Sequence, residues 1–186
     1  MFEKVKERKV GWIELFYDLI FVVGVSSSTQ WLHEIEHINS ENNLIFFKYL
    51  LMVIPMLWAW TGQTMFYNRF GENQTFVKPL MLIQLFFVAL MISSFNLNFD
   101  ETYYTFILGY IGIRTITIIQ YALTYYKTTD YQNRRVIFIL TRGMLISIII
   151  SAISLFFTGQ LRYTILYIGI FLDIILPLLL VQFLKV

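Results

Sequence analysis

Apolar residues dominate six long stretches of this 186-residue chain, and polar residues gather between them. A helix of about 20 predominantly apolar residues is long enough to cross a hydrocarbon core about 30 Å thick. The six predicted membrane-spanning helices cover about residues 12–31, 44–67, 79–97, 103–126, 136–157 and 163–184. We therefore expect an all-α fold, a polytopic transmembrane bundle of six helices that forms a single domain over residues 1–186.

The first apolar stretch carries tryptophans at both ends and two acidic residues inside it. Trp12 and Trp31 are 19 residues apart, and a helix of that length spans roughly 28 Å, which places both at membrane interfaces. Glu14 and Asp18 lie one helical turn apart on one face. Since an acidic residue near a bilayer centre costs about 2.5–3.5 kcal/mol on an insertion scale, something must offset their charge.

Basic residues are distributed unevenly between the predicted loops. One side holds ten of them, at positions 4, 6, 8, 9, 69, 78, 127, 134, 135 and 185, and the other side holds only Arg162. Cytoplasmic loops of membrane proteins carry the excess of Lys and Arg, so both termini are predicted to be cytoplasmic. Asp100 and Glu101 then form a short exterior turn, and Arg134 and Arg135 belong to an inner loop.

The composition supports a membrane protein and excludes several kinds of chemistry. The chain is 58% hydrophobic and 14% charged, with mean hydropathy +0.65, whereas soluble domains carry about 25% charged residues. The absence of cysteine excludes disulfides, thiolate metal sites and a cysteine nucleophile. The net charge of +2 comes from basic residues placed as orientation signals, so we expect no nucleic-acid partner.

Ionisable residues inside the predicted spans are the main functional signal. They are Glu14, Asp18, Arg69, Arg114, Arg142 and Asp173. Arg114 and Asp173 fall near mid-membrane, and the other four lie closer to the cytoplasmic side, so interhelical ion pairs facing the interior of the bundle are expected. Such charges either line a hydrated pathway for a solute or ion, or they fix helix register and assembly alone.

One motif formally resembles a metalloprotease site. The segment H-E-I-E-H at 33–37 matches H-E-x-x-H, in which two histidines on one helical face bind zinc. Its place before a polar loop and the lack of any further histidine favour a solvated helix end. We predict no metal site, no catalytic residues and no enzyme, and, without a histidine pair inside a span or a Gly-rich phosphate loop, no cofactor.

Small residues recur at intervals of four on two of the predicted helices. They are Gly24 and Ser28 on the first, and Gly143, Ser147 and Ser151 on the fifth. Ridges of small residues let helix backbones approach closely in membranes. These positions are predicted to be packing contacts.

The segment W-I-E-L-F-Y-D-L-I-F-V-V-G-V-S, which begins at Trp12, resembles the first motif of the bacterial low temperature requirement protein A family, LtrA. Further similarities follow in order: W-A-W at 58–60, Y-N-R-F at 67–70, Y-I-G-I-R ending at Arg114, and L-D-I-I-L-P at 172–177. The resemblance implies a multi-span protein of the bacterial cytoplasmic membrane. Its polar signature corresponds here to Glu14, Asp18, Arg69, Arg114 and Asp173.

Two further expectations come from likeness to known families. Family members are typically longer, and their second half has no counterpart here, so this chain is expected to be a half-length form that forms a homo-oligomer, or a fragment. Phe16, Asp18, Phe21 and Ser26 are similar to a first-helix motif of six-span potassium channels. Those channels place an arginine shortly before the motif, whereas this chain has Glu14, so ion conduction is only an analogy.

The sequence thus predicts a protein that transports or conducts a small solute or ion, with the lipid bilayer as its surroundings. Asp18 and Glu14 are expected at a cytoplasmic entrance, and Arg114 with Asp173 in a mid-membrane pair. The alternative is a non-transporting membrane stress or assembly factor whose buried charges are structural ion pairs.

Overall fold

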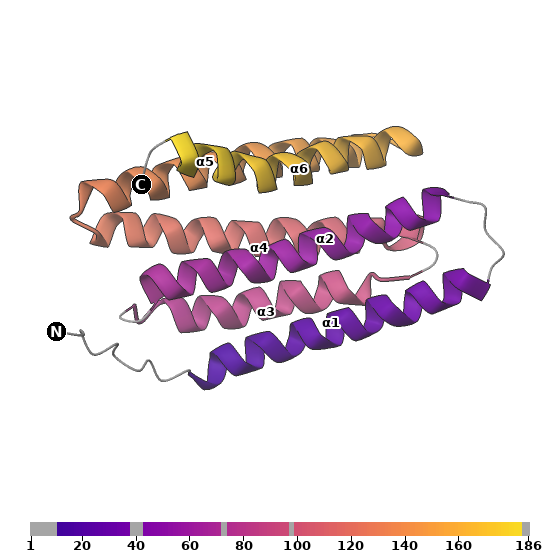
Figure 1. Ribbon diagram of the computed structural model, residues 1–186, viewed down its shortest axis with the longest axis horizontal. Coiled ribbons are helices and arrows are strands. Elements are labelled where there is room, and N and C mark those ends of the chain that lie inside the picture. Colours follow the sequence, from indigo (N-terminus) through magenta and orange to yellow (C-terminus); the bar gives the residue numbers. More distant parts are fainter. Residues whose placement is uncertain (1–10, 38–42, 72–73, 97–98, 184–186) are drawn as a thin grey trace.

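The computed structural model describes residues 11–37, 43–71, 74–96 and 99–183, and every long element in them is a helix (Figure 1). The six long helices are α1 (Trp12–His37), α2 (Asn43–Phe66), α3 (Val77–Ser93), α4 (Phe99–Lys127), α5 (Tyr131–Ile153) and α6 (Gln160–Phe183). A π-helical turn, η1 (Tyr67–Gly71), extends α2, and a 3₁₀ turn, η2 (Ser154–Phe156), extends α5. The predicted all-α class and the predicted number of long helices are confirmed.

Consecutive helices run in alternating directions, so the start of α1 and the end of α6 lie at the same end of the molecule (Figure 1). α4 packs against α2, α3 and α5, while α1 packs against α2 and α3, and α6 packs against α5 and α2. In the described residues 61% of the α4 span is buried, against 28–33% in the spans of α1, α5 and α6. α4 is therefore the central helix.

Four helices in the described ranges are long and apolar enough to cross a membrane: Trp12–Gln30, Phe99–Lys127, Tyr131–Phe156 and Gln160–Pro177. α3 is a shorter apolar helix. The crossing of the membrane by α2 and α3, and the side on which the termini lie, stay predictions.

The start of α4 differs from the predicted loop. Asp100 and Glu101, expected in an exterior turn, lie in the first turn of this helix. Negative side chains stabilise a helix N-terminus because the backbone dipole is positive there. The acidic residues that marked a loop in the sequence are thus part of the helix start.

The start of α5 differs in the same way. The Asp130 carboxylate caps the helix by accepting hydrogen bonds from the backbone N–H groups of Gln132 and Asn133, at 3.2 and 3.4 Å, which satisfies donors that a helix N-terminus leaves unpaired. Because the helix begins at Tyr131, Arg134 and Arg135 are helical and not part of a loop.

Small residues mark the closest helix contacts, as predicted. A Cβ added to Gly24 of α1 would lie 2.5 Å from Met56 Sδ of α2, and one added to Gly169 of α6 would lie 2.4 Å from Ser151 Oγ of α5. Ser28, Ser147 and Ser151 are buried. The sequence pattern did not single out Gly169, nor Gly109 of α4, where α4 approaches the α3 backbone.

A polar cluster joins three helices at the end of the molecule opposite Trp12. Lys48 of α2 forms a salt bridge with Asp100 of α4 at 3.0 Å, and the Tyr163 hydroxyl of α6 donates to the same carboxylate. Arg162 of α6, predicted to be an exterior residue, is 8% exposed, and its guanidinium lies 4.6 Å from the centre of the Tyr103 ring. Its aromatic contact and its Nε–H bond to the Phe157 carbonyl at 2.8 Å explain the burial.

The α3–α4 contact makes a specific prediction for Gly109. A Cβ there would lie 2.8 Å from both the Met91 backbone nitrogen and the Phe87 carbonyl oxygen, and neither backbone atom can rotate away. Gly109→Ala should lower the free energy of unfolding by about 1–3 kcal/mol, measured as a lower thermal midpoint of the purified protein in detergent. Gly143→Ala is the control, because its Cβ would meet Leu176 Cβ at 3.4 Å, an ordinary contact. Equal midpoints for the two variants would contradict the close approach.

Candidate functional site

A buried ion pair connects the central helix to α6. The side chains of Arg114 and Asp173 are 1% and 0% exposed, and Arg114 Nη2 contacts Asp173 Oδ2. The hydroxyl of Tyr110, one turn before Arg114, donates to the same oxygen at 3.2 Å. Burying one charge alone would cost far more than burying the neutralised pair. The predicted ion pair between Arg114 and Asp173 is therefore present, and its position in the middle of the membrane stays a prediction.

The backbone beside Asp173 is tied to a third helix. Pro177 has no N–H, so the carbonyl of Asp173, four residues earlier, cannot form the usual helical hydrogen bond. Trp58 Nε1 of α2 donates to this carbonyl at 3.2 Å. Gly62, one turn further along α2, lets Arg114 approach, since a Cβ there would lie 3.4 Å from Arg114 Nη1. α2 thus contacts both members of the pair.

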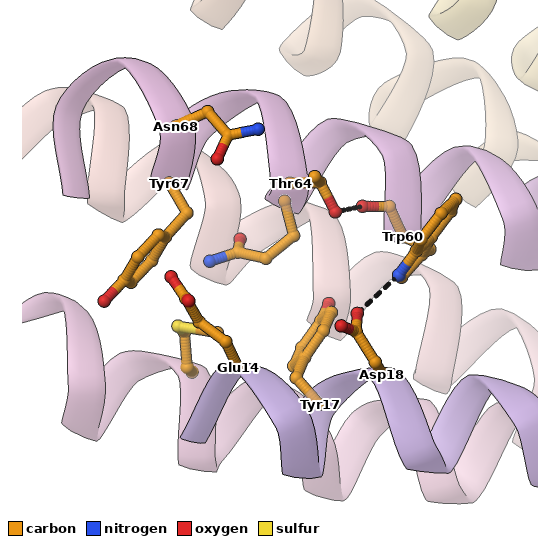
Figure 2. Close-up of a pocket in the computed structure, with 9 residues that line it drawn as sticks. Glu14, Tyr17, Asp18, Trp60, Thr64, Tyr67 and Asn68 are labelled. Carbon is orange, nitrogen blue, oxygen red and sulfur yellow. Dashed lines mark hydrogen bonds between the residues drawn. The ribbon is translucent and has the colours of Figure 1, made fainter. Parts of the chain in front are cut away.

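A pocket of about 300 Å³ lies between the first turns of α1 and the last turns of α2 (Figure 2). Its lining residues are Glu14, Tyr17, Asp18, Trp60, Gln63, Thr64, Tyr67, Asn68 and Met81. Glu14 and Asp18, predicted to share a helix face, both point toward α2 in Figure 2. Among the lining residues that the structure describes, these two carboxylates are the groups that carry charge at neutral pH.

Hydrogen bonds hold both carboxylates at the pocket. Glu14 Oε2 accepts from the Gly11 backbone N–H at 3.2 Å, which caps the start of α1. Asp18 Oδ1 accepts from Trp60 Nε1 at 2.8 Å (Figure 2). Asp18 is exposed and Glu14 is half-buried. The expectation that Asp18 forms an ion pair in the bundle interior is therefore wrong for this chain: its partner is an indole N–H at the pocket edge.

Two polar side chains form the deepest part of the lining. Tyr17 and Gln63 are 2% and 1% exposed. Within the described residues, the Tyr17 hydroxyl and both amide atoms of Gln63 have no hydrogen-bond partner. Buried polar groups in native proteins almost always have partners, so unpaired ones commonly mark functional positions.

The remaining two predicted site residues lie elsewhere. Arg69, in η1, is exposed and donates to Asn133 Oδ1 of α5 through Nε and Nη2, at 3.2 and 2.8 Å. Arg142 of α5 is exposed, with its guanidinium 3.9 Å from the centre of the Phe138 ring. Neither arginine lines the pocket. The sequence predicts that these arginines lie at a membrane depth similar to that of Glu14 and Asp18, but their side chains do not reach the two carboxylates at the pocket.

The H-E-I-E-H segment lies within the last turns of α1, and its side chains lie outside the described residues. Asp173, the one candidate for a third zinc ligand, is instead paired with Arg114.

Sequence reasoning missed most of the pocket lining on α2, although a signal was present. Trp60, Gln63, Thr64 and Tyr67 are spaced at i, i+3, i+4 and i+7, which is one face of a helix. On α1, Glu14, Tyr17 and Asp18 follow the same i, i+3, i+4 spacing. The polar faces of α1 and α2 pack toward each other. The spacing of residues within one helix does not show which other helix it packs against, so the pocket could not be predicted from it.

Comparison with protein families matches residues 9–183 to the model described as Bacterial low temperature requirement A protein (LtrA). No curated protein and no solved structure matched.

The ion pair predicts strong coupling between its two members. Arg114→Ala leaves the Asp173 carboxylate buried without its counter-charge and should cost about 3–5 kcal/mol of stability. Arg114→Ala combined with Asp173→Ala should be more stable than Arg114→Ala alone, as measured by thermal unfolding in detergent. Arg142→Ala, which removes an exposed arginine, is the matched control and should change stability little. Simple additivity of the two pair substitutions would argue against the interaction.

Proposed function

The chain belongs to the LtrA family over nearly its whole length, and from this premise we propose that it is a membrane transporter or channel that takes up a small solute or ion through the pocket between α1 and α2. The pocket is the observation that carries the proposal. It brings two carboxylates and two unpaired buried polar side chains to one cavity in an otherwise apolar chain. Ionisable residues at membrane depth typically mark solute pathways.

The position of the pocket supports its role as an entrance. Glu14 and Asp18 follow Trp12 by two and six residues, which places them roughly 3 and 9 Å along the helix from that tryptophan. Gln63 of the pocket lining is next to Gly62, which contacts Arg114. A solute entering the pocket would therefore meet the Arg114–Asp173 pair next, and this pair would control passage further into the membrane.

The proposal includes an orientation and a location. The excess of basic residues on one side supports cytoplasmic termini in a bacterial cytoplasmic membrane, so the pocket opens to the cytoplasm. No catalytic step is part of the proposal. Arg142 is an exposed charge on a helix of membrane-spanning length. Because a charge that faces lipid is costly, the proposal includes a homo-oligomer in which a second copy of the chain covers Arg142.

The second candidate is a non-transporting stress or assembly factor. The complete enclosure of the Arg114–Asp173 pair favours it, because a closed pair can serve helix assembly alone. The pocket is not needed for that role, so variants of the pocket separate the two candidates.

The proposed orientation can be tested with single cysteines, since the chain has none of its own. Thr158→Cys lies between η2 and α6, and Thr129→Cys lies between α4 and α5. In intact cells a membrane-impermeant maleimide should label Thr158→Cys, and it should label Thr129→Cys only after lysis. The reverse pattern would overturn the orientation.

Transport can be tested in proteoliposomes with K⁺, Na⁺ and choline as separate probes. We expect uptake of at least one probe above that of empty vesicles, and Asp18→Asn should reduce its rate by about tenfold, as expected for a loss of about 1.4 kcal/mol. Glu101→Gln removes the same charge at the start of α4, at the opposite end of the molecule, and should leave the rate unchanged. Uptake at the empty-vesicle level for all probes, with folded protein, would favour the non-transporting factor.

A further inference from the structure

We propose that a groove between α4 and α5 binds the phosphate group of an anionic phospholipid. The groove has a volume of about 260 Å³, and its lining residues are Ala122, Tyr125, Tyr126, Ile137, Phe138 and Thr141. It lies where the last turns of α4 meet the first turns of α5, two helices that pack side by side (Figure 1). The described lining residues differ from those of the pocket between α1 and α2, so the lipid site does not depend on the proposed transport.

Two arginines of α5 lie against the rings that line this groove. The guanidinium of Arg134 is 4.4 Å from the centre of the Tyr125 ring, and that of Arg142 is 3.9 Å from the centre of the Phe138 ring. Both arginines are exposed. Residues 134, 138 and 142 follow one another at intervals of four, which places them on one face of the helix. The two positive charges therefore bracket Phe138 at the groove.

The Arg142 side chain extends toward the start of α5. The Phe138 ring that it contacts belongs to the residue one turn nearer the helix start. Basic side chains in membrane helices extend in this way toward the lipid headgroups, because the hydrocarbon core cannot solvate their charge. The guanidinium of Arg142 is therefore directed toward the same membrane surface as Arg134, where lipid phosphates lie.

The charge around the groove favours a negatively charged headgroup. Residues 122–142 contain four basic side chains and one acidic side chain, Asp130, whose carboxylate caps α5. Basic pockets between membrane helices bind anionic headgroups, and an arginine fork donates two parallel hydrogen bonds to a phosphate. The phosphate would supply a negative charge beside Arg142, and a second copy of the chain, as proposed above, can still cover the site from outside.

Apolar surface beside the groove favours a lipid over a soluble anion. Exposed apolar side chains continue along the two helices away from the groove, at Ile119 and Leu123 of α4 and at Leu145 and Ile149 of α5. Both helices are long enough to span a membrane, so acyl chains can cover these side chains. A volume of about 260 Å³ is below the range of about 300–1,000 Å³ for pockets that enclose a whole ligand. The groove therefore suits a headgroup whose acyl chains lie outside it.

The test is binding of defined phospholipids to the delipidated full chain in detergent, measured by native mass spectrometry. Dioleoyl phosphatidylglycerol is the probe, and dioleoyl phosphatidylcholine, which has the same acyl chains and no net charge, is the matched control. We expect phosphatidylglycerol to bind at least about tenfold more tightly, because two arginines attract its phosphate. Glycerol 3-phosphate, which has the phosphate without acyl chains, should not compete.

Three variants separate this site from general attraction to a basic surface. Arg134→Gln combined with Arg142→Gln should abolish the preference for phosphatidylglycerol. Arg135→Gln removes one charge from the position about 100° further round α5 and should leave the preference unchanged. Phe138→Ala keeps every charge but removes the ring that Arg142 contacts, and should weaken phosphatidylglycerol binding roughly two- to fivefold. All four side chains are exposed, so the thermal midpoints without lipid should stay unchanged.

Each other outcome overturns the inference in a distinct way. Equal binding of the two phospholipids would show that the headgroup charge is not recognised. Competition by glycerol 3-phosphate would assign the groove to a soluble anion. An equal loss of preference in Arg135→Gln would show attraction to the basic surface as a whole. If the double arginine variant is less stable without lipid, Phe138→Ala decides, and unchanged phosphatidylglycerol binding in that variant would place the lipid elsewhere.

Discussion

The ion pair between Arg114 and Asp173 is the interaction on which the packing of the central helices depends. Both side chains are almost completely buried, and a single charge in that environment would be prohibitively costly. The pair therefore requires α4 and α6 to stay in register. The Tyr110 hydroxyl donates a hydrogen bond to the same carboxylate oxygen that Arg114 contacts. Trp58 binds the backbone carbonyl that Pro177 leaves without its helical partner, so α2 is held in the same arrangement.

The carboxylates of the pocket between α1 and α2 are held differently from the carboxylate in the core. In the core, one acid meets one base and the charge is balanced. In the pocket, Glu14 accepts a hydrogen bond from the Gly11 backbone N–H, and Asp18 accepts one from the Trp60 indole. A stable core requires the first arrangement, because an uncompensated charge there would cost about 3–5 kcal/mol of stability.

Gly62 and Gln63 connect these two regions of the protein. Because Gly62 has no side chain, the Arg114 guanidinium can lie close to α2. Gln63, the next residue, lines the pocket with its unpaired amide. Neighbouring positions on one helix thus serve the balanced core and the charged cavity.

Much of the fold could be predicted from hydropathy alone, since the length of apolar runs determines helix positions. The helix ends were less predictable, because Asp100 and Asp130 look like loop residues but start helices by stabilising their N-termini. The Arg114–Asp173 pair was predictable because both charges are deep in long apolar runs and no other compensation exists at that depth. The partners of Asp18, Arg69 and Arg142 were not predictable, since residues near a helix end can reach several neighbours.

The sequence by itself determined the all-helical class, the position of each charged residue along its helix, and the need for a partner for the charges in the middle of long apolar helices. These follow from the linear spacing along a helix, which rises by a constant amount per residue. Only the tertiary structure decided which way each helix is rotated and which helices are neighbours. That rotation directs Asp18 to Trp60, Arg69 to Asn133 and Arg142 to the outer surface of α5. The same rotation brings a polar face of α1 next to a polar face of α2, and the pocket lies between them.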